Sequence, residues 1–197
     1  MRPTHPAEHD SHVAKRRDDL RHSLAEVIPP AARFVWEVGC GHGHFLAAYA
    51  KAHPDQTCIG IDITSDRIAR AERKRERARL GNLRFMRADA DDFLAAMPEG
   101  ARFTSVFILF PDPWPKRRHH KNRVVSPRFL TAAAARSERG ATLHFRTDHE
   151  DYFREVAGAL DAHADWRAAD AASWAFEEAT VFQKRAARHF SLVATRR

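Results

Sequence analysis

A single carboxylate lies between two prolines near the middle of the chain, directly ahead of a cluster of positive charges. Asp112 is flanked by Pro111 and Pro113 and is followed by Trp114. The prolines fix their own φ angles and remove two backbone donors, so we expect the carboxylate to be held stiffly. An apolar run at residues 106–110 precedes this turn and predicts a buried strand. The residues after it form a basic tract (116–123), whose cations are Lys116, Arg117, Arg118, Lys121 and Arg123.

This order of features suits a site that acts on a base within a polyanion. The strand fixes the turn, the turn presents one carboxylate, and the cations attract phosphates. The alternative is a proline turn followed by a solvated charged loop, which is the better interpretation for an isolated P-x-P sequence beside a charge run. The choice between them depends on the rest of the chain.

A glycine-rich turn closes the first predicted strand. Glu37 precedes Gly39, Gly41 and Gly43, and the last glycine opens the next predicted helix. At the carboxyl ends of parallel strands, such turns let a ligand approach the backbone closely. An acid just ahead of the turn would repel pyrophosphate, but it suits a ligand with a cationic amino-acid end, such as S-adenosylmethionine.

Two further acids end the next two predicted strands. Asp62 follows the turn by roughly 20 residues, where an acid can accept hydrogen bonds from ribose hydroxyls. Asp89 ends the third strand and is placed to meet an adenine amino group. Turn glycines with unrelated surface acids are the alternative, but three acids after three successive strands favour a cofactor site.

Strands alternate with helices along most of the chain. Strands are predicted at residues 34–38, 57–61, 83–87, 104–110 and 141–146, and helices at residues 13–27, 44–52, 65–80, 91–97, 127–136 and 150–163. We expect Ser65 to cap the third helix and Gly140 to stop the fifth. Residues 166–168 and 189–195 are predicted to form a terminal antiparallel pair. The pattern predicts an α/β fold with a mostly parallel seven-stranded sheet and helices on both faces, a single domain over residues 13–197, and disorder over residues 1–12.

The composition is that of a soluble globular protein with a basic balance. The 197 residues are 44% hydrophobic and 30% charged, with a formal net charge of +7, and such an excess favours nucleic acid or anionic surfaces. No apolar run is long enough to cross a bilayer, and residues 1–19 contain no apolar signal segment, so we expect a cytoplasmic protein with no membrane partner. Cys40 and Cys58 do not form a C-x-x-C pair and are expected to be reduced and structural.

Other kinds of site find less support. His42 and His44 in the glycine turn, and His119 and His120 in the basic tract, lack acid or cysteine partners at ligand spacing, so no metal is expected. No Ser-His-Asp pattern has the context of a nucleophile elbow. The densely cationic helix at residues 67–79 is most simply a solvated face, with RNA contact as the alternative.

Two motifs resemble those of a known family. Residues 34–146 resemble class I (Rossmann-like) methyltransferases, and F-P-D-P-W-P-K-R-R-H-H-K-N-R at residues 110–123 narrows the resemblance. It is similar to the signature P-D-P-W-x-K-x-R-H-x-K-R-R of the bacterial tRNA (guanine-N7)-methyltransferase family. A further landmark of that family, A-T-D-x-E-x-Y, is similar to R-T-D-H-E-D-Y at residues 146–152.

The resemblance implies a reaction, a partner and a set of site residues. It implies methylation of guanine N7 in tRNA, in the variable loop, with S-adenosyl-L-methionine as cofactor and S-adenosyl-L-homocysteine as product. By this resemblance the cofactor is contacted by Glu37, Asp62, Asp89 and Asp112, of which Asp112 is also catalytic. Gly39, Gly41 and Gly43 of the turn are expected to complete the cofactor site. The substrate is bound by Lys116, Asp148, Thr180 and Gln183. RNA is contacted by Arg117, Arg118, Lys121 and Arg123.

The implied chemistry is consistent with these residue types. Guanine N7 carries an exposed lone pair, so no strong base is needed, and a fixed carboxylate at Asp112 would stabilise the charge that develops on the ring. A base in folded RNA must be exposed to be reached, and Trp114 could stack on it.

The sequence departs from the family near its C-terminal strands. The family has a T-x-F-E segment followed by R and a G-H pair, whereas residues 180–185 read T-V-F-Q-K-R and the G-H pair is missing. Gln183 keeps a hydrogen-bonding oxygen but loses the charge. Two alternatives therefore stay open: a methyltransferase of the same fold acting on another RNA or a small molecule, and an RNA-binding protein without turnover. Both a monomer and a homodimer are compatible with the sequence.

Overall fold

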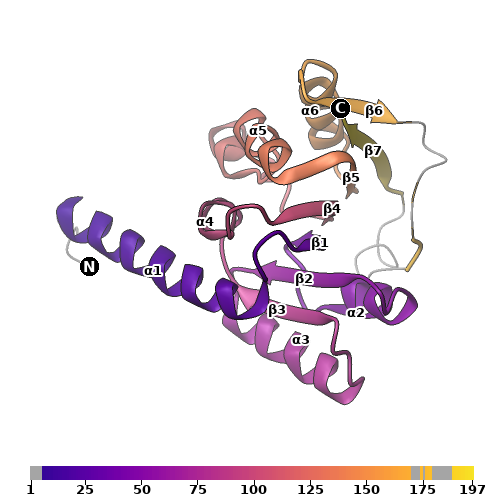
Figure 1. Cartoon of the computed structure of the whole chain (residues 1–197). Coiled ribbons are helices and arrows are strands. Elements are labelled where there is room, and N and C mark those ends of the chain that lie inside the picture. Colours follow the sequence, from indigo (N-terminus) through magenta and orange to yellow (C-terminus); the bar gives the residue numbers. More distant parts are fainter. Residues whose placement is uncertain (1–5, 170–173, 175, 179–187) are drawn as a thin grey trace.

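A seven-stranded sheet forms the centre of the protein in this computed structural model, which describes residues 6–169, 174, 176–178 and 188–197 (Figure 1). The strands are β1 (Arg33–Val38), β2 (Thr57–Asp62), β3 (Leu83–Arg87), β4 (Arg102–Leu109), β5 (Ser137–Thr147), β6 (Trp166–Ala169) and β7 (Phe190–Arg196). Their order is β3-β2-β1-β4-β5-β7-β6. The first five strands pair in parallel, and β7 is antiparallel to both β5 and β6. The predicted mostly parallel seven-stranded sheet and its terminal antiparallel pair are therefore confirmed.

Helices pack on both faces of this sheet. They are α1 (Pro6–Val27), α2 (His44–Ala52), α3 (Ser65–Arg77), α4 (Ala90–Ala96), α5 (Pro127–Arg136) and α6 (Glu150–Asp161), with the 3₁₀ helix η1 (Arg117–Asn122). Successive strand residues point to opposite faces, so Trp36 and Val35 belong to separate cores. Trp36 stacks on Phe103 and Phe93 in the core beneath α1, α4, α5 and α6. Val35 lies in the core beneath α2 and α3, which lie together near β2 and β3 in Figure 1.

Several element bounds differ by a few residues from the sequence-based expectations, and three differences concern named residues. Helix α1 begins at Pro6 rather than at residue 13, while the domain boundary expected there stays a prediction. The N-cap of α3 is Thr64, not Ser65, because Asp62 Oδ1 accepts from the backbone N–H of Thr64 at 2.8 Å and holds it outside the helix. Gly140 does not stop α5, which ends at Arg136; it lies inside β5 with a φ of 83°.

An irregularity in β5 explains the position of Gly140. Phe103 of β4 pairs with Ser137, but Ser105 pairs with Thr142, so β5 contains extra residues between these two pairs. A residue with positive φ is suited to such a bulge, and glycine adopts that conformation without a steric penalty.

Both cysteines are buried free thiols, as predicted. Burial raises the pKa of Cys40 and raises that of Cys58 to about 12. Since the thiolate is the reactive form, these side chains serve packing rather than chemistry.

Candidate functional site

The carboxyl ends of neighbouring strands bring most of the predicted site to one edge of the sheet. Along the strand order β3-β2-β1-β4-β5, the residues that end or follow each strand are Asp89, Asp62, the glycine turn (residues 39–43), Asp112 and Asp148. Parallel strands end at a common edge, which is where open α/β sheets bind their ligands. The structure therefore joins residues that are up to 109 positions apart in the sequence, from Gly39 to Asp148.

The glycine turn combines one crowded position, Gly43, with two open positions, Gly39 and Gly41. A Cβ at Gly43 would overlap the ring of Phe85 and lie 2.9 Å from Cβ of Ala71, so this position requires glycine. Gly41 has a φ of 54°, yet no described atom lies within 4 Å of where its Cβ would be. The turn is thus packed against the protein on one side and open to an incoming group on the other.

Asp62 holds the glycine turn in shape. Its side chain is buried, and its carboxylate accepts from the backbone N–H of Gly41 at 3.1 Å and of Thr64 at 2.8 Å. Arg67 Nη1 lies 3.4 Å from the same carboxylate. Sequence reasoning predicted a ribose contact at Asp62 but missed this structural role.

Glu37 is a buried carboxylate with an unsatisfied oxygen. It is 4% exposed, and its Oε2 has no hydrogen-bond partner among the described residues. Burial raises its pKa to about 8, and Asp62 adds to the rise, while the backbone of Leu46 and the charge of Lys74 oppose it. A buried acid with a free oxygen is costly unless it meets a donor. The site therefore fits the cationic amino group of a ligand such as S-adenosylmethionine.

The β2–β3 end of the edge offers a polar and an apolar contact. Asp89 is exposed and caps α4 through its Oδ1, which accepts from the backbone N–H of Asp91 at 2.9 Å. Ile63, directly after Asp62, is 66% exposed and is the only large hydrophobic side chain that is exposed among the described residues. The sequence analysis missed Ile63, although an apolar residue directly after the acid that ends a strand was available as a signal. Together they suit a flat ring with an exocyclic amino group.

The Asp112 turn is bracketed by two strained residues. Phe110 has a φ of 51° and Trp114 a φ of 45°, and each directly precedes a proline. Bulky residues rarely adopt this left-handed conformation, and a following proline restricts them further. Asp112 itself is exposed. Such strain persists only where the surroundings enforce it, and it is concentrated at functional sites.

Arg123, the last residue of the basic tract, helps to hold the Asp112 turn in its strained conformation. Its Nε donates to the carbonyl oxygen of Pro113 at 2.8 Å, and its guanidinium lies 4.6 Å from the ring centroid of Tyr152. Its Nη1 also pairs with Glu155. The side chain is only 1% exposed, so it has no surface to offer a phosphate. The structure thus corrects the expectation of RNA contact by Arg123, because tertiary contacts with α6 bury it.

The other cations of the basic tract stay on the surface. Lys116, Arg117, Arg118 and Lys121 are exposed. The expected loop is instead largely the 3₁₀ helix η1, which carries Arg117, Arg118 and Lys121 and has Lys116 as its N-cap. Trp114 is half-buried, with its ring edge-on to His119 at 5.8 Å between centroids. Four cations therefore remain available for a polyanion beside one rigid carboxylate.

The end of β5 carries Asp148, which is exposed. The next residue, His149, caps α6 by accepting from the backbone N–H of Tyr152 at 3.4 Å. The other two predicted substrate residues, Thr180 and Gln183, lie outside the described residues.

Phe176 packs on the core that α2 covers, and Trp174 and Glu177 contact β5. The ring of Phe176 lies within 6 Å of those of Phe45, Tyr49 and His53, at 5.9, 5.4 and 5.9 Å between centroids. Arg146 of β5 makes a two-pronged ion pair with Glu177, at 2.7 and 3.1 Å, and its guanidinium lies 3.9 Å over Trp174. These contacts hold Trp174, Phe176 and Glu177 against α2 and β5, a few residues ahead of Thr180.

Residues 6–169, 174, 176–178 and 188–197 contain neither a metal-binding cluster nor a membrane-spanning helix. Within them, no three His, Cys, Asp or Glu side chains are grouped so as to hold a metal ion. None of the helices there is both long and apolar enough to cross a membrane.

Similarity to known proteins is extensive. A family model described as "Putative methyltransferase" matches residues 31–191. The tRNA (guanine-N(7)-)-methyltransferase of Alkalilimnicola ehrlichii is 39% identical over 132 residues, which are 66% of this chain and 55% of that protein. The enzyme of the same name from Streptomyces coelicolor is 38% identical over 143 residues, 73% of this chain and 53% of that protein. The chain thus spans about half the length of these curated relatives.

A solved structure supports the fold. An rRNA methylase from Streptococcus thermophilus superposes with a TM-score of 0.57 at 11% identity, covering 92% of this chain and 94% of that chain. At that identity the likeness shows the fold alone, and it confirms the predicted Rossmann-like arrangement.

Proposed function

The chain belongs to the methyltransferase family whose model matches residues 31–191, and we propose that it methylates guanine N7 in tRNA with S-adenosylmethionine as cofactor. The observation that carries the proposal is the strained Asp112 turn, which follows the strand next to β1 and its glycine turn and leads directly into the exposed cations of the basic tract. The two curated relatives named above, both tRNA (guanine-N(7)-)-methyltransferases, support the same substrate.

The cofactor would be held by the acids along the sheet edge. Glu37 would receive its amino group, because that buried oxygen lacks a partner. Asp62 would face the ribose, while Ile63 and Asp89 would meet the flat face and the amino group of the adenine. When bound, the cofactor supplies a methyl group on a sulfonium, which the N7 lone pair accepts, leaving S-adenosylhomocysteine.

Asp112 would act on the base. The product ring carries a positive charge, so a carboxylate fixed beside it stabilises charge that develops only in the transition state. The prolines and the Arg123 contact hold this carboxylate in place before the base arrives, which lowers the reorganisation needed. No proton has to be removed from N7, which is consistent with the absence of a general base in this proposal.

The exposed cations would bind the RNA. Lys116, Arg117, Arg118 and Lys121 would contact phosphates and the flipped nucleotide, with Asp148, Thr180 and Gln183 completing the substrate pocket. The variable loop is the proposed target, and the cytoplasm the proposed location. A monomer or a homodimer would suit this arrangement.

The test is incubation with methyl-labelled cofactor and unmodified total tRNA, followed by nucleoside analysis. We expect label in 7-methylguanosine. A different labelled nucleoside, or a labelled small molecule, would instead select another substrate for the same fold, which the departure at Gln183 would favour. Cofactor and tRNA binding with no transfer to any RNA would identify a binding protein without turnover.

A further inference from the structure

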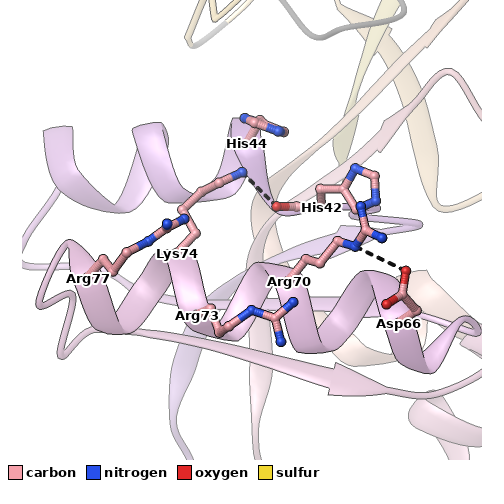
Figure 2. Close-up of a pocket in the computed structure, with 7 residues that line it drawn as sticks. All are labelled: His42, His44, Asp66, Arg70, Arg73, Lys74 and Arg77. Carbon is pink, nitrogen blue, oxygen red and sulfur yellow. Dashed lines mark hydrogen bonds and ion pairs between the residues drawn. The ribbon is translucent and has the colours of Figure 1, made fainter.

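A second cationic surface lies between the glycine turn and α3 (Figure 2). A pocket of about 450 Å³ is lined by His42, His44, Asp66, Arg70, Arg73, Lys74 and Arg77. Four cations face a single carboxylate in this α3 groove. The basic tract after β4 contributes no residue to it.

The cations of the α3 groove share one side of the helix. Arg70, Arg73, Lys74 and Arg77 are spaced three, four and seven residues apart, which places them on one helical face. Ala71 on another face is buried in the core, so the orientation of the helix is fixed. Figure 2 shows the long side chains side by side along α3.

Two of these cations are already engaged and two are available. Arg70 Nε pairs with Asp66 at 3.1 Å, and Lys74 Nζ donates to the carbonyl oxygen of His42 at 2.8 Å. Arg73 and Arg77 are exposed, and neither guanidinium has an ion-pair partner within the described part of the chain. The engaged pair therefore shapes the groove, and the available pair would meet an anion.

The groove suits an extended anion better than a compact one. From Arg70 to Arg77 the helix advances roughly 10 Å, which corresponds to about three phosphates at the axial spacing of about 3.4 Å per charge along a nucleic-acid strand. Guanidinium groups bind phosphate oxygens through paired N–H donors. His42 belongs to the glycine turn, so the groove borders the proposed cofactor site.

We propose that the α3 groove binds the phosphate backbone of the tRNA, as a contact separate from the basic tract. The inference rests on the proposed function, because it takes the substrate of that site as its ligand. A tRNA that reaches both surfaces would be held on two sides of the cofactor turn. This arrangement would orient the substrate as well as attract it.

The test compares two double charge reversals. Arg73→Glu with Arg77→Glu alters the groove, and Arg139→Glu with Arg167→Glu is the matched control. The control arginines are also exposed. They lie in β5 and β6, on the opposite side of the sheet from β3 and β2, the strands that α3 contacts. Both variants change the net charge equally, so a difference between them reports position. Circular dichroism melts first establish that both variants are folded.

Dissociation constants for unmodified tRNA would be measured over a range of salt concentrations. We expect the groove variant to bind at least about tenfold more weakly, and its log–log salt slope to fall by about two, since each lost phosphate contact removes about 0.9. The control should change far less. The KM for tRNA should rise in the groove variant while the cofactor affinity is retained.

The outcomes separate this proposal from the proposed reaction. Groove and control variants with equal tRNA affinity, while the wild type forms 7-methylguanosine, would overturn the groove and leave the reaction standing. If the groove variant alone lost tRNA affinity but the wild type transferred no methyl group, the groove contact would be supported and the proposed reaction would be overturned. Pyrophosphate binding lost in the groove variant, with unchanged tRNA affinity, would assign the groove to a small anion and overturn the RNA contact.

Discussion

The Nε of Arg123 donates a hydrogen bond to the carbonyl oxygen of Pro113 at 2.8 Å, and this bond links the buried end of the basic tract to the residue after Asp112. The same guanidinium packs on Tyr152 and pairs with Glu155, both on α6. Arg123 therefore fixes the position of the Asp112 turn, although it lies in a basic tract that would be expected to bind phosphates.

Replacing Arg123 with methionine should therefore slow methyl transfer without weakening RNA capture. We expect kcat to fall by about 10²-fold, the size of effect that a small misplacement of a catalytic group can cause. The free energy of unfolding should fall by about 2 kcal/mol, since one charged hydrogen-bond donor is lost from a buried position. Single-turnover kinetics and urea denaturation measure the two effects. Lysine should not rescue kcat, because it lacks the planar donor geometry.

Arg117→Met is the control, because Arg117 belongs to the same tract but is exposed. It should raise the dissociation constant for tRNA and lower the salt slope by about one, with kcat unchanged. If Arg123→Met showed that pattern instead, Arg123 would be an RNA contact after all.

Substitution of Asp112 should abolish the reaction while leaving the protein intact. Asp112→Ala and Asp112→Asn are expected to lower the rate of methyl transfer by at least about 10²-fold, as for the loss of a group that stabilises transition-state charge. Cofactor affinity and melting temperature should stay close to those of the wild type, because the side chain is exposed. Asp151→Ala, at an exposed acid on α6, is the control. Full transfer activity in Asp112→Ala would remove the basis of the proposed mechanism.

Glu37 should make stability depend on pH. Its pKa is raised from 4.5 to about 8, mainly by burial, so the folded protein holds this proton more tightly than the unfolded chain. The resulting stabilisation is complete below about pH 4.5 and is lost as the pH rises through about 8. Melting temperatures of the wild type minus those of Glu37→Gln should therefore fall over this interval. A difference that stays flat or rises with pH would show that Glu37 is ionised in the folded protein.

Removing the ring of Phe176 should weaken substrate binding more than cofactor binding. The ring packs on Phe45 and Tyr49 of α2, and it lies four residues ahead of Thr180. We expect Phe176→Ala to lower the free energy of unfolding by about 1–3 kcal/mol, less than for a fully buried phenylalanine, and to raise the KM for tRNA. Phe176→Leu should keep most of both properties. An unchanged KM in a destabilised Phe176→Ala protein would limit this residue to packing.

Local signals predicted most elements but not their exceptions. Helices α2 and α5 and strand β3 have the predicted bounds, because apolar periodicity and flanking Gly or Pro residues agree at each of them. Gly140 was misjudged because its positive φ serves a bulge in β5, and that bulge depends on pairing with β4. In a sequence, a glycine that ends a helix cannot be told from a glycine that forms a bulge in a strand.

The sequence predicted which residues would gather at the site better than it predicted what each of them does there. The order of acids along the sheet edge follows from strand–helix alternation, so Glu37, Asp62, Asp89 and Asp112 could be grouped from the sequence. The burial of Arg123 could not, since Tyr152 and Glu155 lie about 30 residues further along the chain. The α3 groove could not be predicted from the sequence either, because it forms only where α3 packs beside His42, which belongs to a different segment of the chain.

The position of β7 in the sheet has a consequence for synthesis on the ribosome. β7 lies between β5 and β6, so β6 emerges before the strand with which it pairs. Ala169 ends β6 and Phe190 begins β7, an interval of roughly one to four seconds at typical rates of translation. Until β7 pairs with them, one edge of β5 and both edges of β6 have no partner strand in this sheet. Arg167, an exposed charge in β6, is the kind of residue that discourages pairing with foreign strands in a nascent chain.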